Sequence, residues 1–259
     1  MEFLPIVLKN LLGREEDLSK IKRYFHENFP VMFYRTNDLI HSRRVLWHLE
    51  EAIPNILSVY GTGFETEFAR TLALVHDDVE ILTGDIQLHE KEKMNKGELE
   101  LLAKNETESL PRIIEKYGST ANGFDYAELL TAAKEKTRLE AQFVSFFDKF
   151  DGAGESWHEV WAGNSHFLVP AGGRDGQNGG YVRRLREFPI KYPGMARFFE
   201  QYPSYLPTPF NFKLAAEHGK PHTKVSLHED SGYPPYERWK SAIIKREGNN
   251  LLLARREFN

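Results

Sequence analysis

Apolar residues recur along much of this chain at the spacing of an α-helix. In residues 15–29 they stand at i, i+3, i+7 and i+11, which predicts a helix that ends before Pro30. The cap-forming residues 36–38 predict the start of a second helix, which is expected to run to about Ala52. A third helix is expected at 65–79, where an apolar stripe again follows helical spacing.

The longest helical pattern covers residues 126–151. A core-facing stripe follows i, i+4, i+7, i+8 and i+11 within it, and Trp157 and Trp161 extend the pattern. Shorter helices on a solvated surface are expected at 98–102 and 111–117, because charged residues surround them. The residues of the long stripe are Leu139, Phe143, Phe146, Phe147 and Phe150.

The composition of the chain changes after Gly152, and helical periodicity becomes weaker. The glycine-rich segment 171–180 predicts an exposed loop, and 236–245 predicts one further helix. We therefore expect an all-α fold with two parts. Residues 1–164 form a helical domain, and residues 165–259 form an extension of irregular, in part mixed, structure that packs on it.

Bulk properties exclude several classes of partner. The 259 residues carry a formal net charge of −4, so no overall basic field attracts nucleic acid. No apolar stretch approaches the roughly 20 residues that cross a bilayer, so no membrane partner is expected. The chain has no cysteine, which excludes disulfides and thiolate metal sites. A basic leader before the first apolar residues is lacking, so a cytoplasmic location is expected.

Candidate chemistry is densest at residues 72–85, where an apolar helix pattern turns polar. His76, Asp77 and Glu80 follow within five positions, and residues three or four apart on a helix share a face. Imidazole and carboxylate together suit Mn, Fe, Co, Zn or Mg. Gly84 is expected to end this helix in a left-handed conformation. A single His-Asp pair is common by chance, so a metal site requires further ligands elsewhere.

Two other segments offer such ligands. His41 lies in the first turn of the second predicted helix, where a packed histidine without a ligand role is the ordinary interpretation. His48 is expected on a more exposed face of that helix. Asp148 lies within the aromatic block of the longest pattern, where an unpaired carboxylate would be costly. It is either a metal ligand or a surface residue, and Asp151 is its nearest competitor.

The order H…HD…D over these helices resembles the HD-domain superfamily of metal-dependent phosphohydrolases. Residues 76–85 have the form H-D-x-x-E-x-x-T-G-D. This form is similar to the branch that contains the 5′-deoxynucleotidases, which act on deoxyribonucleoside monophosphates. Residues 147–150, Phe-Asp-Lys-Phe, are similar to the tract around the last metal ligand of that branch. The resemblance covers about residues 30–162.

This resemblance implies an HD-type helical bundle with one divalent metal ion (Mn, Co, Mg, Fe or Zn). It implies that Glu80 is the catalytic acid or base, that Asp85 lies at the substrate pocket, and that Arg35 contacts the phosphate. Ile40 replaces the Glu that usually precedes the first histidine, so the resemblance leaves nucleotide specificity open. The metal ligands that it implies are His41, His76, Asp77 and Asp148.

Three functions follow from these patterns. The leading one is a metal-dependent phosphohydrolase that releases phosphate from a nucleoside 5′-monophosphate or a similar small ester. A nucleotide phosphodiesterase or a hydrolase of polyphosphorylated nucleotides on the same fold is the alternative. A non-catalytic metal-bearing binding module is the third. The expected partner is a small phosphate ester, and a homodimer is left open.

Overall fold

The computed structural model describes residues 8, 10–24, 32–86, 88–164, 167, 176–208 and 230–247. It confirms the all-α fold class. In chain order the helices are α1 (Arg14–Lys20), α2 (Asp38–Tyr60), α3 (Thr66–Val75), α4 (Glu80–Thr83), α5 (Leu88–Lys93), α6 (Lys96–Tyr117), α7 (Tyr126–Glu135), α8 (Leu139–Trp161), α9 (Gly176–Lys191), α10 (Ala196–Gln201) and α11 (Pro234–Glu247). Two-residue strands, β1 (Thr120–Ala121) and β2 (Phe124–Asp125), pair antiparallel.

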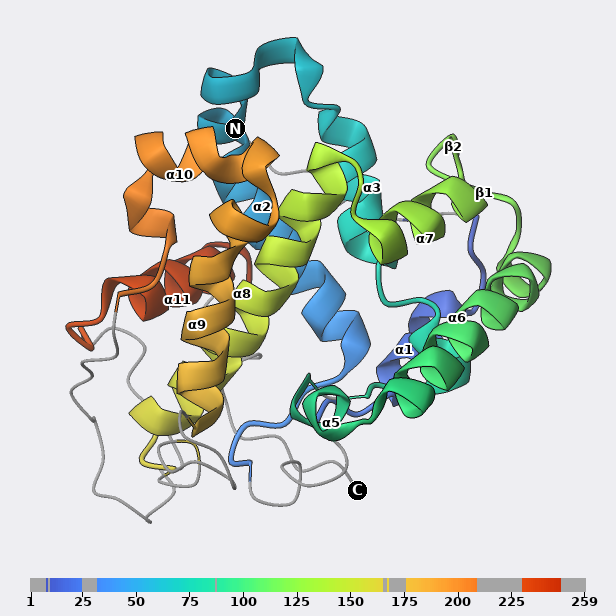
Figure 1. The fold of residues 1–259 in the computed structure, drawn as a ribbon, viewed down its shortest axis with the longest axis horizontal. Helices are drawn as coiled ribbons and strands as arrows, with labels where there is room; N and C mark the ends of the chain where they lie inside the picture. Colours follow the sequence, from blue (N-terminus) through green and yellow to red (C-terminus); the bar gives the residue numbers. More distant parts are fainter. Residues whose placement is uncertain are drawn as a thin grey trace.

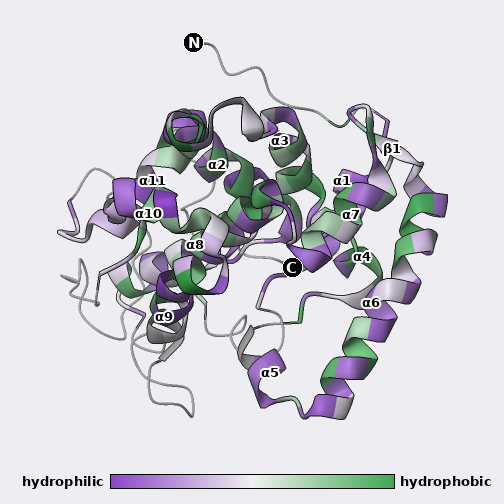
Figure 2. Ribbon diagram, turned by 45° about the horizontal axis from the view of Figure 1, so that its top comes forward, coloured by the Kyte–Doolittle hydropathy of each residue, from purple (hydrophilic) through white to green (hydrophobic). Residues whose placement is uncertain are grey.

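Helices α2, α3 and α8 form the centre of the bundle (Figure 1). Val45, Leu72 and Phe143 come from these three helices, and each is fully buried in one continuous core cluster. Burying such a side chain contributes about 1.5–3 kcal/mol relative to leaving it in water. Figure 2 shows hydrophobic residues concentrated in the middle of the bundle. The apolar stripes of the sequence therefore face one another, as helical periodicity predicts.

Helix α2 is longer than the pattern predicts. Asn37 is its N-cap, and the side chain accepts a hydrogen bond from the N–H of Ile40. The expected end near Ala52 is wrong, because the helix passes through Pro54 and continues to Tyr60. Ile53, Ile56 and Val59 of this last part are buried. Their burial offsets the roughly 3 kcal/mol that a proline costs inside a helix.

The predicted helix at 15–29 is wrong at residues 21–24. Ile21 is extended, and Lys22 pairs with Asn37 in an isolated antiparallel bridge. The N–H of Arg23 donates to the carbonyl of Thr36 at 3.2 Å, which extends this pairing. Backbone bonds to the start of α2 thus replace further helical turns. The rest of that prediction, residues 25–29, lies outside the described residues.

The predicted helix at 65–79 is also interrupted. Helix α3 ends at Val75, residues 76–79 form turns, and α4 begins at Glu80. Gly84 ends α4 with a φ of +77°, a backbone conformation that glycine adopts without strain. The interruption turns Asp78 inward to a buried ion pair with Arg14. His76 and Glu80 therefore do not stack on one regular helical face.

The long pattern at 126–151 divides into two helices. Lys136 ends α7 with a left-handed φ of +55°, and α8 starts at Leu139. Arg138 joins the break to α3 and α7 through ion pairs with Glu65 and Glu128, both at 2.7 Å. Helix α8 then runs on to Trp161, so the expected extension through the two tryptophans is confirmed.

The described part of the C-terminal extension is helical rather than of mixed structure. Helix α9 packs on α8, and α11 packs on both α2 and α8 (Figure 1). Leu185, Phe198 and Trp239 from this part belong to the same core cluster as the central helices. The domain boundary at 164 stays a prediction.

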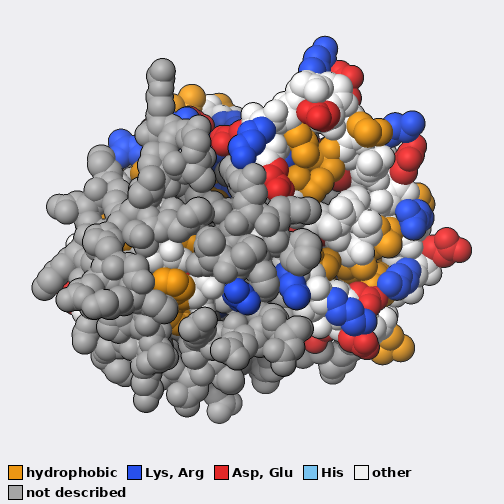
Figure 3. All heavy atoms as spheres, turned by 90° about the horizontal axis from the view of Figure 1, so that it is seen from below, with side chains coloured by type: hydrophobic (Ala, Val, Ile, Leu, Met, Phe, Trp, Pro, Cys, Tyr) orange, Lys and Arg blue, Asp and Glu red, His pale blue; other side chains and the backbone are white. Residues whose placement is uncertain are grey.

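The outer surface carries the polar residues. Helix α6 is capped by Asn95 and Glu98, lies at the edge of the bundle and is largely exposed (Figure 2). It is one helix through Pro111 where two short pieces were predicted. Charged side chains of both signs are interspersed with apolar ones over the described part of the face in Figure 3. None of the described helices has the length and apolar character that a bilayer span requires.

Candidate metal and substrate site

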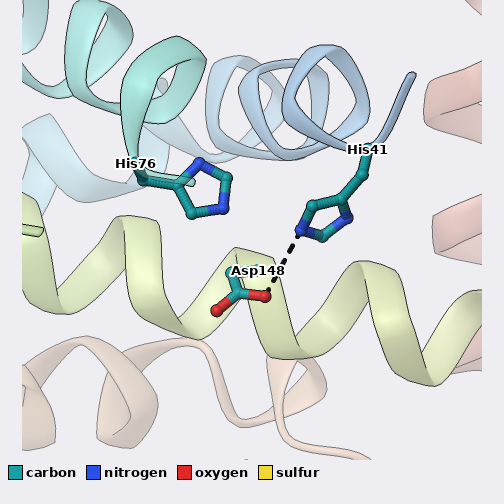
Figure 4. Close-up of side chains that lie close together, drawn as sticks. All are labelled: His41, His76 and Asp148. Carbon is teal, nitrogen blue, oxygen red and sulfur yellow. Dashed lines mark ion pairs between the residues drawn. The ribbon is translucent and has the colours of Figure 1, made fainter. Parts of the chain in front are cut away.

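Three side chains from separate elements converge at the centre of the bundle (Figure 4). His41 comes from the first turn of α2, His76 from the end of α3, and Asp148 from the middle of α8. One ligand-type atom of each lies within 4.8 Å of the others. His41 is fully buried, which fits a position where its polar atom needs a partner inside the protein.

Asp77 joins the same cluster. Its Oδ2 lies 3.2 Å from Nε2 of His76 and 3.4 Å from Nε2 of His41. Oδ1 of Asp148 lies 3.4 Å from the same His41 nitrogen. Ligand atoms about 2.0–2.2 Å from one divalent ion stand roughly 3–3.5 Å apart. These three pairs therefore have the spacing of ligands in a single coordination shell.

The two histidines support this assignment. Neither Nε2 forms a hydrogen bond with a described group, although both atoms are buried. The opposite nitrogens are occupied: Nδ1 of His76 lies 2.9 Å from the carbonyl of Ala73, and Nδ1 of His41 lies 2.8 Å from Asp151. A buried nitrogen that forms no hydrogen bond costs free energy unless something binds it. The donor set fits a divalent ion.

The electrostatics of the cluster favour positive charge at its centre. Burial and Arg23 act to lower the pKa of His41, but the carboxylates of Asp148 and Asp151 outweigh them and raise it to about 10. Burial acts to raise the pKa of Asp148, yet Lys149 and the histidines hold it well below its usual range. The carboxylates are therefore ionised and stabilise a cation between them.

Asp148 and Asp151 have different places although both lie on α8. Asp148 faces the Nε2 side of His41, while Asp151 is fully buried behind the ring on the Nδ1 side. His48, expected on an exposed face, is buried and lies 3.4 Å from Asp151. That expectation is wrong because α11 covers this face of α2.

A second group of carboxylates adjoins the cluster. Oxygens of Asp38, Glu80 and Asp85 lie within 4.8 Å of one another. Burial raises the pKa of Glu80 well above its usual value, and the charges of Asp77, Asp85 and Asp38 raise it further. Oε2 of Glu80 is buried and forms no hydrogen bond with a described group. Glu80 and Asp85, predicted for catalysis and for the substrate pocket, thus lie together.

Sequence reasoning missed two residues at this second group. The buried Arg23 lies 3.7 Å from Asp38 and 3.2 Å from Glu155. The backbone N–H of Tyr24 donates to Asp85 at 3.3 Å. They had been assigned to a helix, and only the bridge between residues 22 and 37 carries them to the site. No local pattern in the sequence signals this pairing.

A cavity of about 220 Å³ opens beside the predicted metal ligands, lined mainly by α4, α6, α7 and α8. His76 and Val144 are among its walls. Four acidic and four basic side chains also line it. They are Asp77, Glu80, Glu106 and Asp148, and Lys91, Lys134, Lys136 and Lys149.

The lysines differ in their partners. Lys149 lies 2.5 Å from Asp148, and Lys134 donates to the carbonyl of Ala103 at 2.9 Å. The Lys136 ammonium forms no ion pair or hydrogen bond with any residue that the structure describes, and burial together with Lys149 lowers its pKa. A partly buried cation of this kind is suited to an anionic ligand. Arg35 is partly buried, and its phosphate contact stays a prediction.

A helical bundle that brings two histidines and two aspartates to one point, with His76 and Asp77 adjacent in the chain, is an HD domain. Residues 16–172 match the family described as 5′-deoxynucleotidase YfbR-like, and the chain belongs to this family. The resemblance inferred from the sequence is thereby confirmed. Membership points to a hydrolase of the 5′-deoxynucleotidase type.

Structural comparison agrees on the fold. A solved structure of a conserved hypothetical protein from Pyrococcus furiosus matches with a TM-score of 0.51 and 19% sequence identity. The match covers 74% of this chain and 94% of that one. At this identity the likeness shows a shared fold alone. No curated protein matches the chain.

Proposed function

We propose that this protein is a metal-dependent phosphomonoesterase that releases phosphate from a nucleoside 5′-monophosphate or a similar small phosphate ester. The convergence of His41, His76, Asp77 and Asp148 beside Glu80 and a charged cavity carries the proposal. The family description, which names a 5′-deoxynucleotidase, supports the nucleotide as substrate.

The four side chains of the cluster would hold one divalent ion through the Nε2 atoms of His41 and His76 and the carboxylates of Asp77 and Asp148. When bound, such an ion polarises a phosphoryl oxygen and lowers the pKa of a bound water. Asp151 holds the opposite nitrogen of His41, which keeps the ring from turning away from the cluster.

In this proposal Glu80 transfers protons. It shares the cavity wall with His76, Asp77 and Asp148. Burial raises its pKa, so its protonated form can give a proton to the leaving oxygen of the ester, and its ionised form can take one from the attacking water. General acid–base help of this kind typically contributes about 10²–10⁴-fold in rate.

The charge of the cavity matches a phosphate monoester. Four lysines line it, and a divalent ion held by the predicted ligands would add positive charge beside them. A phosphate monoester dianion is an anion suited to such a site. Lys136, whose ammonium lacks a partner among the described residues, and Lys149 are the cations suited to bind the phosphate oxygens.

The second group of carboxylates is suited to the rest of the substrate. Both oxygens of Asp38 lack a hydrogen bond among the described residues, and burial together with the charge of Asp85 raises the pKa of Asp38 well above its usual value. A protonated carboxyl both donates and accepts, as sugar hydroxyls do. Arg23, 3.7 Å from Asp38, offsets part of the negative charge there.

A phosphodiesterase or a hydrolase of longer nucleotides is the second candidate. One observation favours it: the carboxylates of Asp38, Glu80 and Asp85 are close enough to share a second cation. Metal analysis of the purified chain separates the two candidates. Two ions per chain would favour the second candidate, and one ion the monoesterase.

A phosphate-release screen tests the proposal. Deoxyribonucleotides, ribonucleotides and sugar phosphates would each be incubated with the protein and Mn²⁺, Co²⁺ or Mg²⁺, and again with a chelator. We expect phosphate release from nucleoside 5′-monophosphates that the chelator abolishes. Folded protein that releases phosphate from none of these esters with any of the three ions would show that the chain is not this enzyme.

A further inference from the structure

One residue that supports the proposed metal site, Trp239, lies outside the residues 16–172 that match the family. Trp239, on α11, donates its indole N–H to Oδ1 of Asp151 at 2.7 Å. The other oxygen of Asp151 lies 2.8 Å from Nδ1 of His41. A continuous chain of hydrogen bonds therefore runs from α11 through α8 to a ligand on α2. All three side chains are at most 1% exposed.

The neighbouring residues leave space for the indole of Trp239. A Cβ at Gly154, one turn beyond Asp151 on α8, would lie 2.0 Å from the Trp239 ring, so only glycine leaves room for it. The guanidinium of Arg44 lies 5.4 Å from the centre of the Trp239 ring, within the range of a cation–π contact.

Ion pairs fasten the same helix to α2. Arg246 binds Glu50 at 3.1 Å, and Lys245 binds Glu51 at 2.6 Å. These pairs lie one to two turns beyond Trp239 on α11. They fix the position of the helix, while the indole N–H supplies a directed bond to Asp151.

We infer that Trp239 is a positioning residue of the metal site, which acts by holding Asp151 so that Nε2 of His41 faces the ion. The inference rests on the proposed metal site. Carboxylates that bind the far nitrogen of a metal-ligating histidine set the orientation of its ring, and loss of such support typically weakens metal binding about 10–100-fold. Nε2 of His48 also contacts Oδ1 of Asp151, at 3.4 Å, so without the shorter bond from the indole N–H this oxygen would keep only the longer contact.

The chain offers a matched control. Trp157 is also fully buried, but its indole nitrogen has no hydrogen-bond partner among the described residues. Trp239→Phe and Trp157→Phe each remove comparable buried volume. Only the first removes a bond to Asp151, so a difference between the two variants reports on that bond.

Calorimetric titration of the metal-stripped full-length chain with Mn²⁺ is the test. We expect Trp239→Phe to raise the Kd about 10–100-fold, and Trp157→Phe to leave it within about threefold. Equal Kd values for the two variants would overturn the inference. No Mn²⁺ binding by the wild-type chain would instead overturn the metal site itself.

Thermal melting in the presence of a chelator checks that each variant folds. Should Trp239→Phe not fold, the isostere 3-benzothienylalanine can be placed at position 239, because it keeps the shape and replaces the N–H by sulfur. The same rise in Kd is expected. A folded isosteric variant with wild-type Mn²⁺ affinity would overturn the role of the N–H.

Discussion

Arg14 and Asp78 form a buried ion pair, with Nε of Arg14 2.5 Å from Oδ2 of Asp78 and neither side chain more than 2% exposed. The guanidinium also donates to the carbonyl of Leu74, and the Tyr126 hydroxyl donates to the same carboxylate. Asp78 directly follows Asp77 in the chain. The pair therefore fixes the turn that presents two of the predicted metal ligands.

Arg14→Met should destabilise the protein strongly. It leaves the Asp78 carboxylate buried without its counter-ion, and breaking such a pair costs about 3–5 kcal/mol. Urea denaturation measures the change in free energy of unfolding. Arg43→Met, which breaks an exposed ion pair with Glu15, is the control and should cost at most about 1 kcal/mol. Equal losses for the two variants would contradict the structural role of Arg14.

Removal of a predicted ligand should remove the metal. Asp77→Ala and His76→Ala each delete one of the four predicted metal ligands. We expect each variant to lose stoichiometric metal after dialysis, as measured by elemental analysis, while remaining folded. Stoichiometric metal in both variants would show that the ion lies elsewhere.

Glu80→Gln should separate metal binding from catalysis. The amide keeps the size of the side chain but cannot exchange a proton, so kcat should fall about 10²–10⁴-fold. Metal content should stay at the wild-type value, because Glu80 lies outside the cluster of predicted ligands. Unchanged turnover would show that another group activates the water.

Lys136→Met should weaken substrate binding. Its ammonium lines the cavity and has no partner among the described residues, so a charge-assisted bond to phosphate would form without breaking another. Such a bond is worth about 1.5–3 kcal/mol, or roughly 10- to 150-fold in kcat/KM. Lys104→Met, on the exposed face of α6, is the control. An unchanged kcat/KM for Lys136→Met would rule out this contact.

Glu159 should make stability depend on pH. Burial raises its pKa from 4.5 to about 7, even though the backbone N–H groups of Phe33 and Tyr34 favour the ionised form. The folded chain then binds the proton more tightly than the unfolded chain. This contribution is fully present below about pH 4.5 and is lost as the pH rises through 7.

The contribution of Glu159 to the free energy of unfolding is of the order of 3 kcal/mol. Free energies of unfolding at pH 5 and pH 7.5 for wild type and Glu159→Gln measure it. The advantage of wild type over the variant should shrink at the higher pH. A pH-independent difference would show that the pKa of Glu159 is not raised.

The sequence by itself determined the fold class and the candidate site. Helical periodicity places apolar stripes on one face, and burial of those stripes requires a bundle. The ten-residue tract from His76 to Asp85 was recognisable because its ligands are close in the chain. His41 and Asp148 could be added because the resemblance supplies their order.

Only the tertiary structure decided where the helices break and which residues support the site. The apolar patterns at 65–79 and 126–151 are continuous in the sequence, but the helices break at 76–79 and at 136–138. Tertiary contacts such as the ion pair between Arg14 and Asp78 outweigh local helix propensity there. Periodicity also could not separate Asp148 from Asp151, since residues three apart on a helix point to similar sides.

The same limit applies to Arg23 and Trp239. Arg23 reaches the site through a backbone bridge, and Trp239 reaches Asp151 across 88 positions of the chain. Neither contact leaves a local signal in the sequence, because each arises from the packing of elements that are distant along the chain. The positions of these residues are therefore properties of the folded bundle, whereas the ligand-type residues themselves could be identified along the chain.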